Sequence, residues 1–334
     1  MNFAATLLQW FKNNGRSLPW RETNDAYAIW LSEVILQQTR IVQGMSYWER
    51  FMAQWPTVND LAAATEDEVL KAWQGLGYYS RARNLHTAAQ QVVELGGFPQ
   101  TFKELKTLKG VGDYTAAAIA SIAFGEPVAV VDGNVYRVLS RYFGIDTPID
   151  STEGKKEFQA LAQSLLPINE PADYNEAIMD FGATQCTPNS PHCSACPLCE
   201  TCVAFREQRI NELPVKSKKV KQRERHFTYL YIEHEGKIAI HQRGAGDIWQ
   251  GLWEFPQAEQ LTSSEDSAWE NEAQLLKKGV KHILTHQILL ADIYLWQPKN
   301  RPQLPSEFIW IEKQDLENYA LPRLIEILLK AVPA

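Results

Sequence analysis

The stretch LKGVGDYTAAAIASIAFG, residues 108–125, places one glycine on each side of Val111, directly before an alanine-rich segment. Gly110 and Gly112 allow a sharp backbone turn, and alanine favours helix, so the stretch predicts two helices joined by a tight hairpin. The N–H groups at the start of the second helix would be uncovered there, and such groups bind phosphate. An ordinary helical hairpin with a glycine turn fits the same residues.

The residues on both sides of this hairpin carry the apolar spacing of helices. From residue 1 to about 213, apolar side chains recur at intervals of three and four, with Gly, Pro, Asp or Asn at the breaks. We therefore predict a mainly α-helical domain over 1–213. The expected helices are 3–13, 26–39, 41–53, 66–74, 80–95, 114–123, 134–143, 153–165 and 172–183.

The sequence pattern changes after residue 213. The basic run KSKKVKQRER, residues 216–225, indicates a solvated linker, which we place at 214–225. Beyond it, HFTYLYIEH, KIAIHQR and HILTHQILLADIYLW alternate as strands do, and LPRLIEILLKA has the spacing of a helix. Residues 226–334 therefore predict a separate α+β domain.

Length and composition limit the class of protein. A chain of 334 residues can form two cored domains. No apolar run approaches the roughly 18 residues that a membrane span needs, and the N-terminus MNFAATLLQWFKNN lacks the pattern of a signal peptide. We therefore expect a cytoplasmic protein, in a reducing compartment where a disulfide framework is disfavoured.

All five cysteines lie within CTPNSPHCSACPLCETC, residues 186–202. Four thiolates so close in sequence can bind one metal centre. Structural zinc sites mostly use two separate C-x2-C pairs. With Cys199 set aside as a spare, the spacing Cys186-x6-Cys193-x2-Cys196-x5-Cys202 has one such pair. A [4Fe–4S] cluster also takes four cysteines. The spacing favours a cluster modestly over zinc, with cysteines that bind no metal as a distant third alternative, and does not decide among them.

Two acidic residues stand out in the helical part. Asp132 follows the apolar run PVAVV and precedes a helix, where it can serve as the N-cap or as an ionised carboxylate near a positive helix end. Glu33 lies among Trp30, Leu31 and Val34, so burial favours its protonated form unless a cation pairs with it. A structural ion pair would also explain Glu33. One protonated and one ionised carboxyl together suit cleavage of a glycosidic bond.

A set of motifs in the first 210 residues resembles the MutY-type adenine DNA glycosylases. The blocks are LPWR (18–21), SEVILQQTR (32–40), GLGYYSRARNLH (75–86), GVGDYTAAAI (110–119) and VDGNVYRV (131–138), together with the cysteine spacing. The resemblance implies a helix-hairpin-helix glycosylase fold with a [4Fe–4S] cluster. It matches the cluster ligands to Cys186, Cys193, Cys196 and Cys202 and leaves Cys199 outside the set.

The same resemblance implies removal of adenine opposite 8-oxoguanine, and of adenine opposite guanine, from double-stranded DNA by a nucleoid-associated monomer. The adenosine would be flipped out of the helix into a pocket. Glu33 would then protonate the base and Asp132 would stabilise the positive sugar, with Tyr114 and Asn134 supporting them. Tyr114 stands where strand-nicking relatives carry lysine, so a monofunctional enzyme is expected.

Further contacts follow from the family match. Arg16, Trp20, Arg21 and Glu176 match residues of the adenine pocket; Gln38, Leu76 and Tyr78 match duplex contacts; and Gly110, Val111 and Gly112 match the phosphate-binding hairpin.

GAGDIWQGLWEFPQ, residues 244–257, resembles the start of a Nudix-like domain. The segment SSEDSAWENEA, residues 263–273, lacks the carboxylates that hold magnesium in Nudix pyrophosphatases, so nucleotide hydrolysis is not expected. In the family this domain reads the 8-oxoguanine strand, through a loop that matches Thr285 and His286. Leu284 replaces the usual aromatic residue of that loop.

The formal net charge of −7 opposes DNA binding, and the whole acidic excess lies in residues 1–213. DNA binding would then depend on a local basic face, for which five lysine and arginine residues are candidates. Other functions stay open: a thymine or oxidised-pyrimidine glycosylase on the same scaffold, and a non-enzymatic, zinc-stapled DNA-binding protein. The candidates for the basic face are Arg81, Arg83, Lys103, Lys106 and Lys109.

Overall fold

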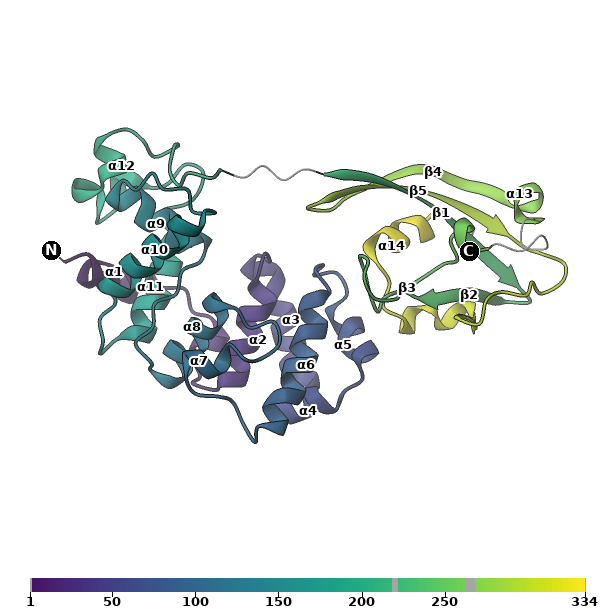
Figure 1. Cartoon of the computed structure of the whole chain (residues 1–334), viewed down its shortest axis with the longest axis horizontal. Coiled ribbons are helices and arrows are strands. Elements are labelled where there is room, and N and C mark those ends of the chain that lie inside the picture. Colours follow the sequence, from purple (N-terminus) through teal and green to yellow (C-terminus); the bar gives the residue numbers. More distant parts are fainter. Residues whose placement is uncertain (1, 218–221, 262–267, 334) are drawn as a thin grey trace. The chain divides into compact units, whose positions relative to one another are not determined.

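The computed structural model describes residues 2–217, 222–261 and 268–333. The chain forms two compact units, each with a core of its own (Figure 1). Met1–Ala63 and Thr87–Lys218 make up the first unit, and Ala64–His86 and Lys219–Ala334 make up the second.

Parts of two expected segments fall outside the described residues. These parts are 218–221 of the linker and 262–267 of the stretch 263–273. The domain boundaries 1–213, 214–225 and 226–334 stay a prediction. Across the described residues, no helix is both long and apolar enough to cross a membrane.

The first unit is helical, as the apolar spacing predicts. Gly125 and Gly144 end two of its helices in the left-handed conformation, at φ 69° and 71°. Its helices are α1 (Phe3–Asn14), α2 (Ala26–Leu36), α3 (Ile41–Gln54), α4 (Val58–Ala63), α7 (Phe102–Leu105), α8 (Asp113–Phe124), α9 (Gly133–Phe143), α10 (Thr152–Leu165), α11 (Pro171–Thr184) and α12 (Val203–Arg206), with 3-10 turns at Pro19–Arg21, Cys193–Ala195 and Cys199–Thr201.

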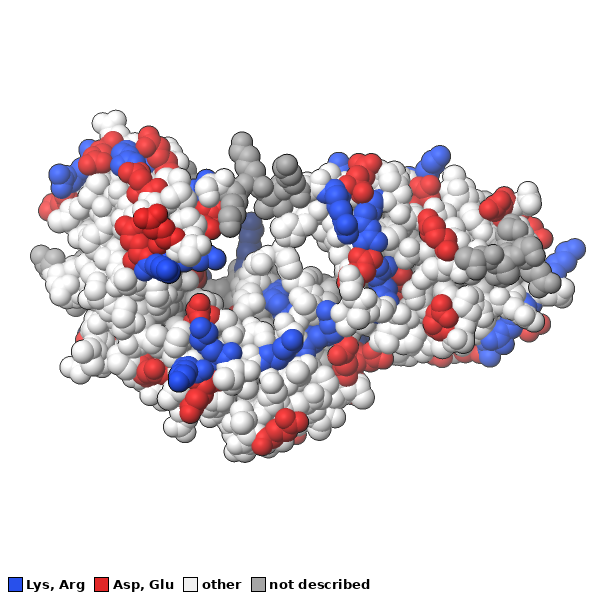
Figure 2. Space-filling model, viewed as in Figure 1, with Lys and Arg blue, Asp and Glu red and all other residues white. Residues whose placement is uncertain are grey.

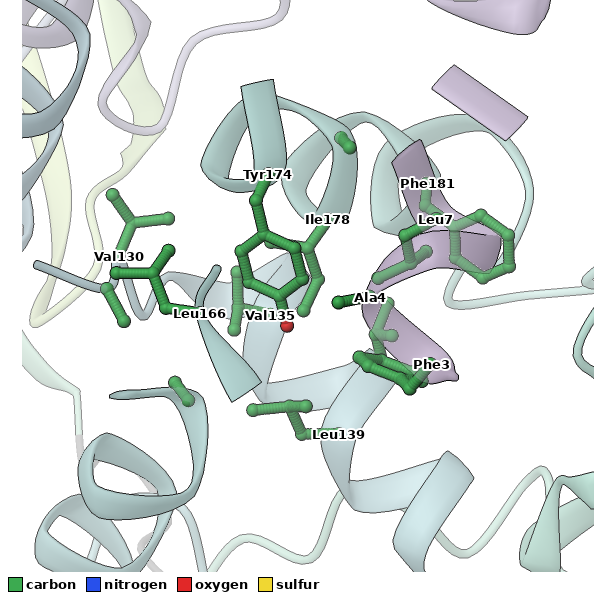
Figure 3. Packing of buried hydrophobic residues seen from close by; sticks show 14 of the residues in the cluster. Phe3, Ala4, Leu7, Val130, Val135, Leu139, Leu166, Tyr174, Ile178 and Phe181 are labelled. Carbon is green, nitrogen blue, oxygen red and sulfur yellow. The ribbon is translucent and has the colours of Figure 1, made fainter. Parts of the chain in front are cut away.

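The core of this unit forms where α1, α9 and α11 meet (Figure 3). Leu7, Leu139 and Phe181 are almost completely buried there, and full burial of such a side chain stabilises the fold by about 1.5–3 kcal/mol. Ala117 and Ala118 bring α8 onto the same core. The core therefore sets the spacing of α8, α9 and α11, which carry or adjoin several of the expected site residues.

One helix ends earlier than the sequence predicts. The expected range 26–39 continues the apolar pattern, but α2 ends at Leu36. Gln37 leaves the helical conformation with φ −57° and ψ 113°, and Gln38 has a left-handed backbone with φ 58°. A non-glycine residue rarely adopts that conformation, and its presence breaks the helix that the side-chain pattern alone would continue.

The second unit contains a six-stranded sheet with the order β3-β2-β1-β5-β4, in which β6 pairs with β2. β1 and β5 run parallel, and the other pairs are antiparallel. The unit also holds helices α5 (Glu66–Trp73), α13 (Trp269–Glu272), α14 (Arg323–Leu329) and the start of α6 (Ser80–Glu94). The strands are β1 (Arg223–His234), β2 (Lys237–Gln242), β3 (Trp253–Glu254), β4 (Gln274–Ile283), β5 (Gln287–Trp296) and β6 (Phe308–Glu312).

Alternation along β1 places its side chains in two separate clusters. Tyr229 and Tyr231 pack with α14 in the main core of the unit, whereas Leu230 and Ile232 pack on the other face with Trp296. This is the period-two pattern of a strand that is covered on both faces. The predicted α+β character of this part of the chain is confirmed.

Residues 64–86 belong to the second unit although the sequence places them among the helices of the first part. Arg83 Nη1 donates a hydrogen bond to the Gln250 carbonyl oxygen at 2.6 Å, and Gln242 Nε2 donates to Asp67 at 2.8 Å. A Cβ on Gly251 would lie only 3.0 Å from Leu70 Cδ1. Close packing of this kind requires the small residue there.

Candidate active site

A cavity of about 620 Å3 opens in the first unit, lined from the N-terminal turn, α2, α8, α9 and α11. We call it the first cavity. It brings together every residue that the sequence assigned to catalysis or to the adenine pocket. Those residues are Arg16, Trp20, Arg21, Glu33, Tyr114, Asp132, Asn134 and Glu176.

Glu33 lies on α2, a helix with buried side chains on all sides, and is itself 8% exposed. Its carboxyl accepts a hydrogen bond from the Tyr114 hydroxyl at 2.5 Å. The pKa of Glu33 is raised to about 7, mainly by burial and also by the nearby Asp132 and Glu176 carboxyls, against the lowering effects of the Tyr114 bond and Arg21. Glu33 is therefore able to carry a proton into the cavity near neutral pH.

Asp132 is the N-cap of α9 and also lines the first cavity. Its carboxylate accepts hydrogen bonds from the backbone N–H of Val135 and from Asn134 Nδ2, both at 2.8 Å. Burial raises the pKa of Asp132, and these two donors offset only part of that effect. The capping role and the position facing the cavity are therefore both present in one residue.

A buried acid that sequence reasoning missed organises the arginines of the cavity. Asp180 on α11 accepts hydrogen bonds from the Arg16 backbone N–H at 2.9 Å, from Arg16 Nε at 2.7 Å and from Arg21 Nη2 at 3.2 Å. Burial opposes its charge, but the bonds from both arginines outweigh burial and hold the pKa of Asp180 below its usual range.

Arg21 also contacts a second acid, since its Nε lies 3.3 Å from Glu176. Burial raises the pKa of Glu176 to about 7 in spite of this arginine. Glu176 and Asp180 are four residues apart on α11 and so lie on the same side of the helix. The four-residue spacing from Glu176 is the feature of the sequence from which Asp180 could have been predicted to lie near the first cavity.

A second missed residue connects the first cavity with the cysteine segment. Arg137 Nη2 donates to Asn134 Oδ1 at 2.8 Å, and Arg137 Nε donates to the carbonyl oxygen of Cys186 at 2.8 Å. Because Asn134 also donates to Asp132, hydrogen bonds run from Asp132 to the first cysteine. Arg137 lies within the quoted block VDGNVYRV, but its partner near Cys186 is distant in sequence.

The five cysteines border one small cavity, which Arg141 also lines. Arg141 Nη1 lies 3.5 Å from Cys186 Sγ and donates to the Thr187 carbonyl oxygen at 2.7 Å. Burial raises the pKa of Cys196 to about 12, so a thiolate there needs a compensating cation. In the described parts of the chain, no three His, Cys, Asp or Glu side chains are placed to hold one metal ion. A [4Fe–4S] cluster needs four thiolates around a common centre, and the cysteines present meet that demand in number and in facing one cavity.

The glycine hairpin has the expected form. Gly110 takes a left-handed backbone with φ 75°, and Gly112 is the N-cap of α8 without a side-chain hydrogen bond. A Cβ on Gly112 would meet no atom within 4 Å, so the approach to the helix start is open. Val111 is buried and anchors the turn.

A second cavity, of about 510 Å3, lies in the second unit between residues 75–83 and two loops near Trp249 and Thr285. The Tyr78 hydroxyl and Thr285 Oγ1 form a hydrogen bond of 2.6 Å there. Leu76 and His286 also line this second cavity, so four of the predicted lesion and duplex contacts meet in it. Gln38 lines neither cavity, but it shares with Tyr78 a left-handed backbone, with φ 58° and 48°.

Three of the five residues of the predicted basic face contact other groups of the protein and are therefore less available for DNA. Arg81 stacks over the rings of Trp73 and Tyr78, and Arg83 donates to the Gln250 carbonyl oxygen. Lys106 pairs with Asp113 at 2.5 Å. On the face in Figure 2, lysines and arginines form short runs between acidic groups. Arg81 and Arg83 therefore act within the fold, because intramolecular partners offset the cost of burying their charges.

Comparisons with known proteins give the class. Residues 31–167 match the model of the HhH-GPD superfamily of base excision DNA repair proteins, and residues 228–331 match the model of a NUDIX domain. A structure of a thermostable thymine-DNA glycosylase is similar, with a TM-score of 0.57 and 32% identity, covering 61% of this chain and 95% of that one. The fold is therefore that of a helix-hairpin-helix base-excision repair protein joined to a Nudix-like domain.

Relatives over longer stretches narrow the family. The adenine DNA glycosylase of Buchnera aphidicola subsp. Schizaphis graminum is 30% identical and aligns over 98% of both chains. The human adenine DNA glycosylase is 37% identical over 83% of this chain, which spans 60% of the human protein's length. The chain belongs to the adenine DNA glycosylase family.

Proposed function

We propose that this protein removes adenine from A·8-oxoguanine and A·G mispairs in duplex DNA, acting as a monofunctional glycosylase and as a monomer. The observation that carries the proposal is that Glu33 and Asp132 both line the first cavity. The pKa of Glu33 is raised to about 7, and Asp132 lies at a helix start. Family membership supports adenine as the base.

The proposed reaction uses the two carboxyls differently. A flipped adenine enters the first cavity, with Arg16, Trp20, Arg21 and Glu176 lining its binding site. Glu33 donates a proton to adenine N7, which makes the base a better leaving group. The Asp132 carboxylate stabilises the positive charge that develops on the sugar.

The absence of a strand-nicking step is supported by the cavity lining. A lyase reaction needs an amine that forms a Schiff base with the sugar. In the described part of the chain, no lysine lines the first cavity, and Tyr114 is placed beside Glu33 instead. We therefore expect the product to be an intact abasic strand.

Recognition of the opposite strand is proposed for the second cavity. A·8-oxoguanine and A·G pairs differ only on the strand opposite adenine, through the N7–H and the C8 oxygen. Thr285, His286 and Tyr78 supply hydrogen-bonding groups to the second cavity, and such groups can distinguish these two edges.

A [4Fe–4S] cluster is proposed at Cys186, Cys193, Cys196 and Cys202. It would tie the end of the helical part to α9 through Arg137 and Arg141. We expect a yellow-brown protein in which Cys199→Ser keeps the colour and Cys193→Ser loses it. A colourless, fully active protein with one bound zinc would refute the cluster.

A thymine glycosylase is the second candidate, because the similar solved structure carries that name. Base release should be measured on A·8-oxoguanine, A·G and T·G duplexes under single-turnover conditions. We expect release from the first two, with A·8-oxoguanine preferred. Release of thymine without adenine would replace the proposed substrate with the alternative.

A further inference from the structure

The second unit contains a buried ionic cluster that the proposed reaction does not use. Arg243, directly after β2, and Glu254, on β3, have side chains that are 7% and 1% exposed. Arg243 Nη1 donates to both carboxylate oxygens of Glu254, at 2.7 and 2.6 Å. Neither residue lines the second cavity.

Glu254 is surrounded by donors. It accepts hydrogen bonds from the Tyr229 hydroxyl at 2.9 Å and from Gln257 Nε2 at 2.6 Å, and His241 Nε2 lies 3.1 Å away. Burial alone would raise the pKa of Glu254, but the bond from His241 and the charge of Arg243 outweigh burial and lower it. The pair is therefore a fixed anchor.

The remaining nitrogens of Arg243 hold the loop of residues 244–251. Nε donates to the Ile248 carbonyl oxygen at 2.8 Å, and Nη2 donates to Asp247 at 2.8 Å. The Arg243 guanidinium also lies 5.8 Å from the centre of the Trp249 ring. Trp249 has a left-handed backbone with φ 61°, a conformation that a large side chain keeps only when its surroundings enforce it.

The loop that is held in this way forms a wall of the second cavity. Asp247, Ile248 and Trp249 all line it, on the same cavity as Tyr78 and Thr285. The Trp249 ring faces His282 at 6.1 Å, next to the strand end that leads into Thr285. Movement of this loop would change the shape of the second cavity, although every side chain that could contact DNA would still be present.

We propose that Arg243 and Glu254 are positioning residues for lesion recognition: they hold the loop 244–251 as a wall of the second cavity and thereby determine how strongly adenine opposite 8-oxoguanine is preferred over adenine opposite guanine. The proposal rests on the proposed function, since it assigns a task to the cavity that would read the opposite strand. A buried ion pair is weak evidence for stability, because an apolar pair of similar volume often stabilises as well. Its connection to the loop gives the pair a different role.

The test uses the full chain and two matched double variants. Arg243→Met with Glu254→Gln removes both charges together, so that no buried charge is left unpaired. Lys237→Met with Glu312→Gln makes the same chemical change in an ion pair of 3.4 Å between β2 and β6, at half-exposed positions outside the cavity. Single-turnover adenine release is measured on A·8-oxoguanine and A·G duplexes, with hydrogen exchange of residues 244–251.

We expect the first double variant to lower the preference ratio about tenfold, which corresponds to ~1.4 kcal/mol of discrimination, and to lose exchange protection in the loop. The control variant, Lys237→Met with Glu312→Gln, should keep the preference ratio and the exchange protection of the unmodified protein. Arg243→Lys keeps the charge but lacks the planar fork, so an intermediate ratio is expected. If the first double variant does not fold, Arg243→Lys carries the test.

Two outcomes would overturn the inference. In the first, the double variant of Arg243 and Glu254 loses hydrogen-exchange protection in the loop 244–251, but its preference ratio stays at the value of the unmodified protein. The other is an equal loss of rate on both duplexes, as a general loss of stability would give. Failure of the proposed function looks different, because the unmodified protein would then show no preference for 8-oxoguanine at all.

Discussion

Glu33 and Glu254 are both buried glutamates, one in each compact unit, and their pKa values move in opposite directions. Glu33 receives one hydrogen bond, from the Tyr114 hydroxyl. Glu254 receives bonds from Tyr229, from Gln257 and, on both carboxylate oxygens, from Arg243 Nη1. The number and charge of the donors decide whether a buried carboxyl can deliver a proton or acts as a fixed anion.

Among the described residues, two arginines that line the first cavity together with Glu33 donate to a different acid. Arg16 and Arg21 lie in the same cavity, but both bond to Asp180. Asp180 therefore resembles Glu254: it is fully buried and holds its charge through arginine contacts. Glu33, Asp132 and Glu176 line the first cavity and have raised pKa values. Asp180 does not line it and is, like Glu254 in the second unit, an anion held by arginine.

The largest effect is expected where a carboxyl performs chemistry. Glu33→Gln cannot donate a proton and Asp132→Asn cannot balance the sugar charge, so each should lower single-turnover adenine release by roughly 10²–10⁴-fold. Duplex affinity, measured by fluorescence anisotropy, should change little. Glu153→Gln, an exposed acid in the first turn of α10, is the control. Near-normal turnover of Asp132→Asn would show that Asp132 serves only as the N-cap of α9 and not in catalysis.

Asp180→Asn should come next, because it removes the charge of a buried acceptor that holds two part-buried arginines, Arg16 and Arg21. Breaking a buried pair on one side costs about 3–5 kcal/mol, so we expect a marked fall in the free energy of unfolding, measured by denaturant titration. Asp173→Asn, at an exposed position of the same helix, should change it far less. Equal stability of the two variants would contradict the anchoring role of Asp180.

The pH dependence of adenine release should separate the two glutamates further. In the proposed reaction the protonated form of Glu33 is the active one. Its pKa is raised to about 7, mainly by burial, so the rate should fall as pH rises through that value. Glu33 interacts with the Asp132 and Glu176 carboxyls, so the apparent pKa belongs to this group of acids and not to Glu33 alone. Because the Glu176 charge raises the pKa of Glu33, Glu176→Gln should move the fall to lower pH.

A flat rate profile between pH 6 and 9 would contradict this assignment of the proton to Glu33. Glu254 has a lowered pKa and should stay ionised over the same range. Hydrogen exchange of residues 244–251, corrected for the intrinsic pH dependence of exchange, should accordingly report the same opening free energy throughout.

The smallest effect is expected for the exposed bond between Tyr78 and Thr285. Tyr78→Phe and Thr285→Val each remove it, at a cost of about 0.5–1.5 kcal/mol, visible as a several-fold loss of the A·8-oxoguanine preference. The double variant should lose little more than either single one, since both remove the same bond. Fully additive losses would mean that the two groups act separately on DNA.

Much of the architecture follows from local sequence. Apolar spacing predicts the helices to within a few residues, as for α9 (Gly133–Phe143) against an expected 134–143. Gly110 and Gly112 predict the hairpin. Clustering predicts that the cysteines lie close together, and they border one cavity. These features depend on periodicity and on backbone freedom, both of which act over a few residues.

Partners across the chain could not be predicted in this way. Arg16 and Asp180 are 164 positions apart, and no local pattern connects them. The buried pair Arg243 and Glu254 and the assignment of residues 64–86 to the second unit also depend on contacts between distant segments. The sequence alone determined which residues can donate protons, carry charge or turn the chain. The tertiary structure decided which of them are buried together, and burial with or without donors determines their chemistry.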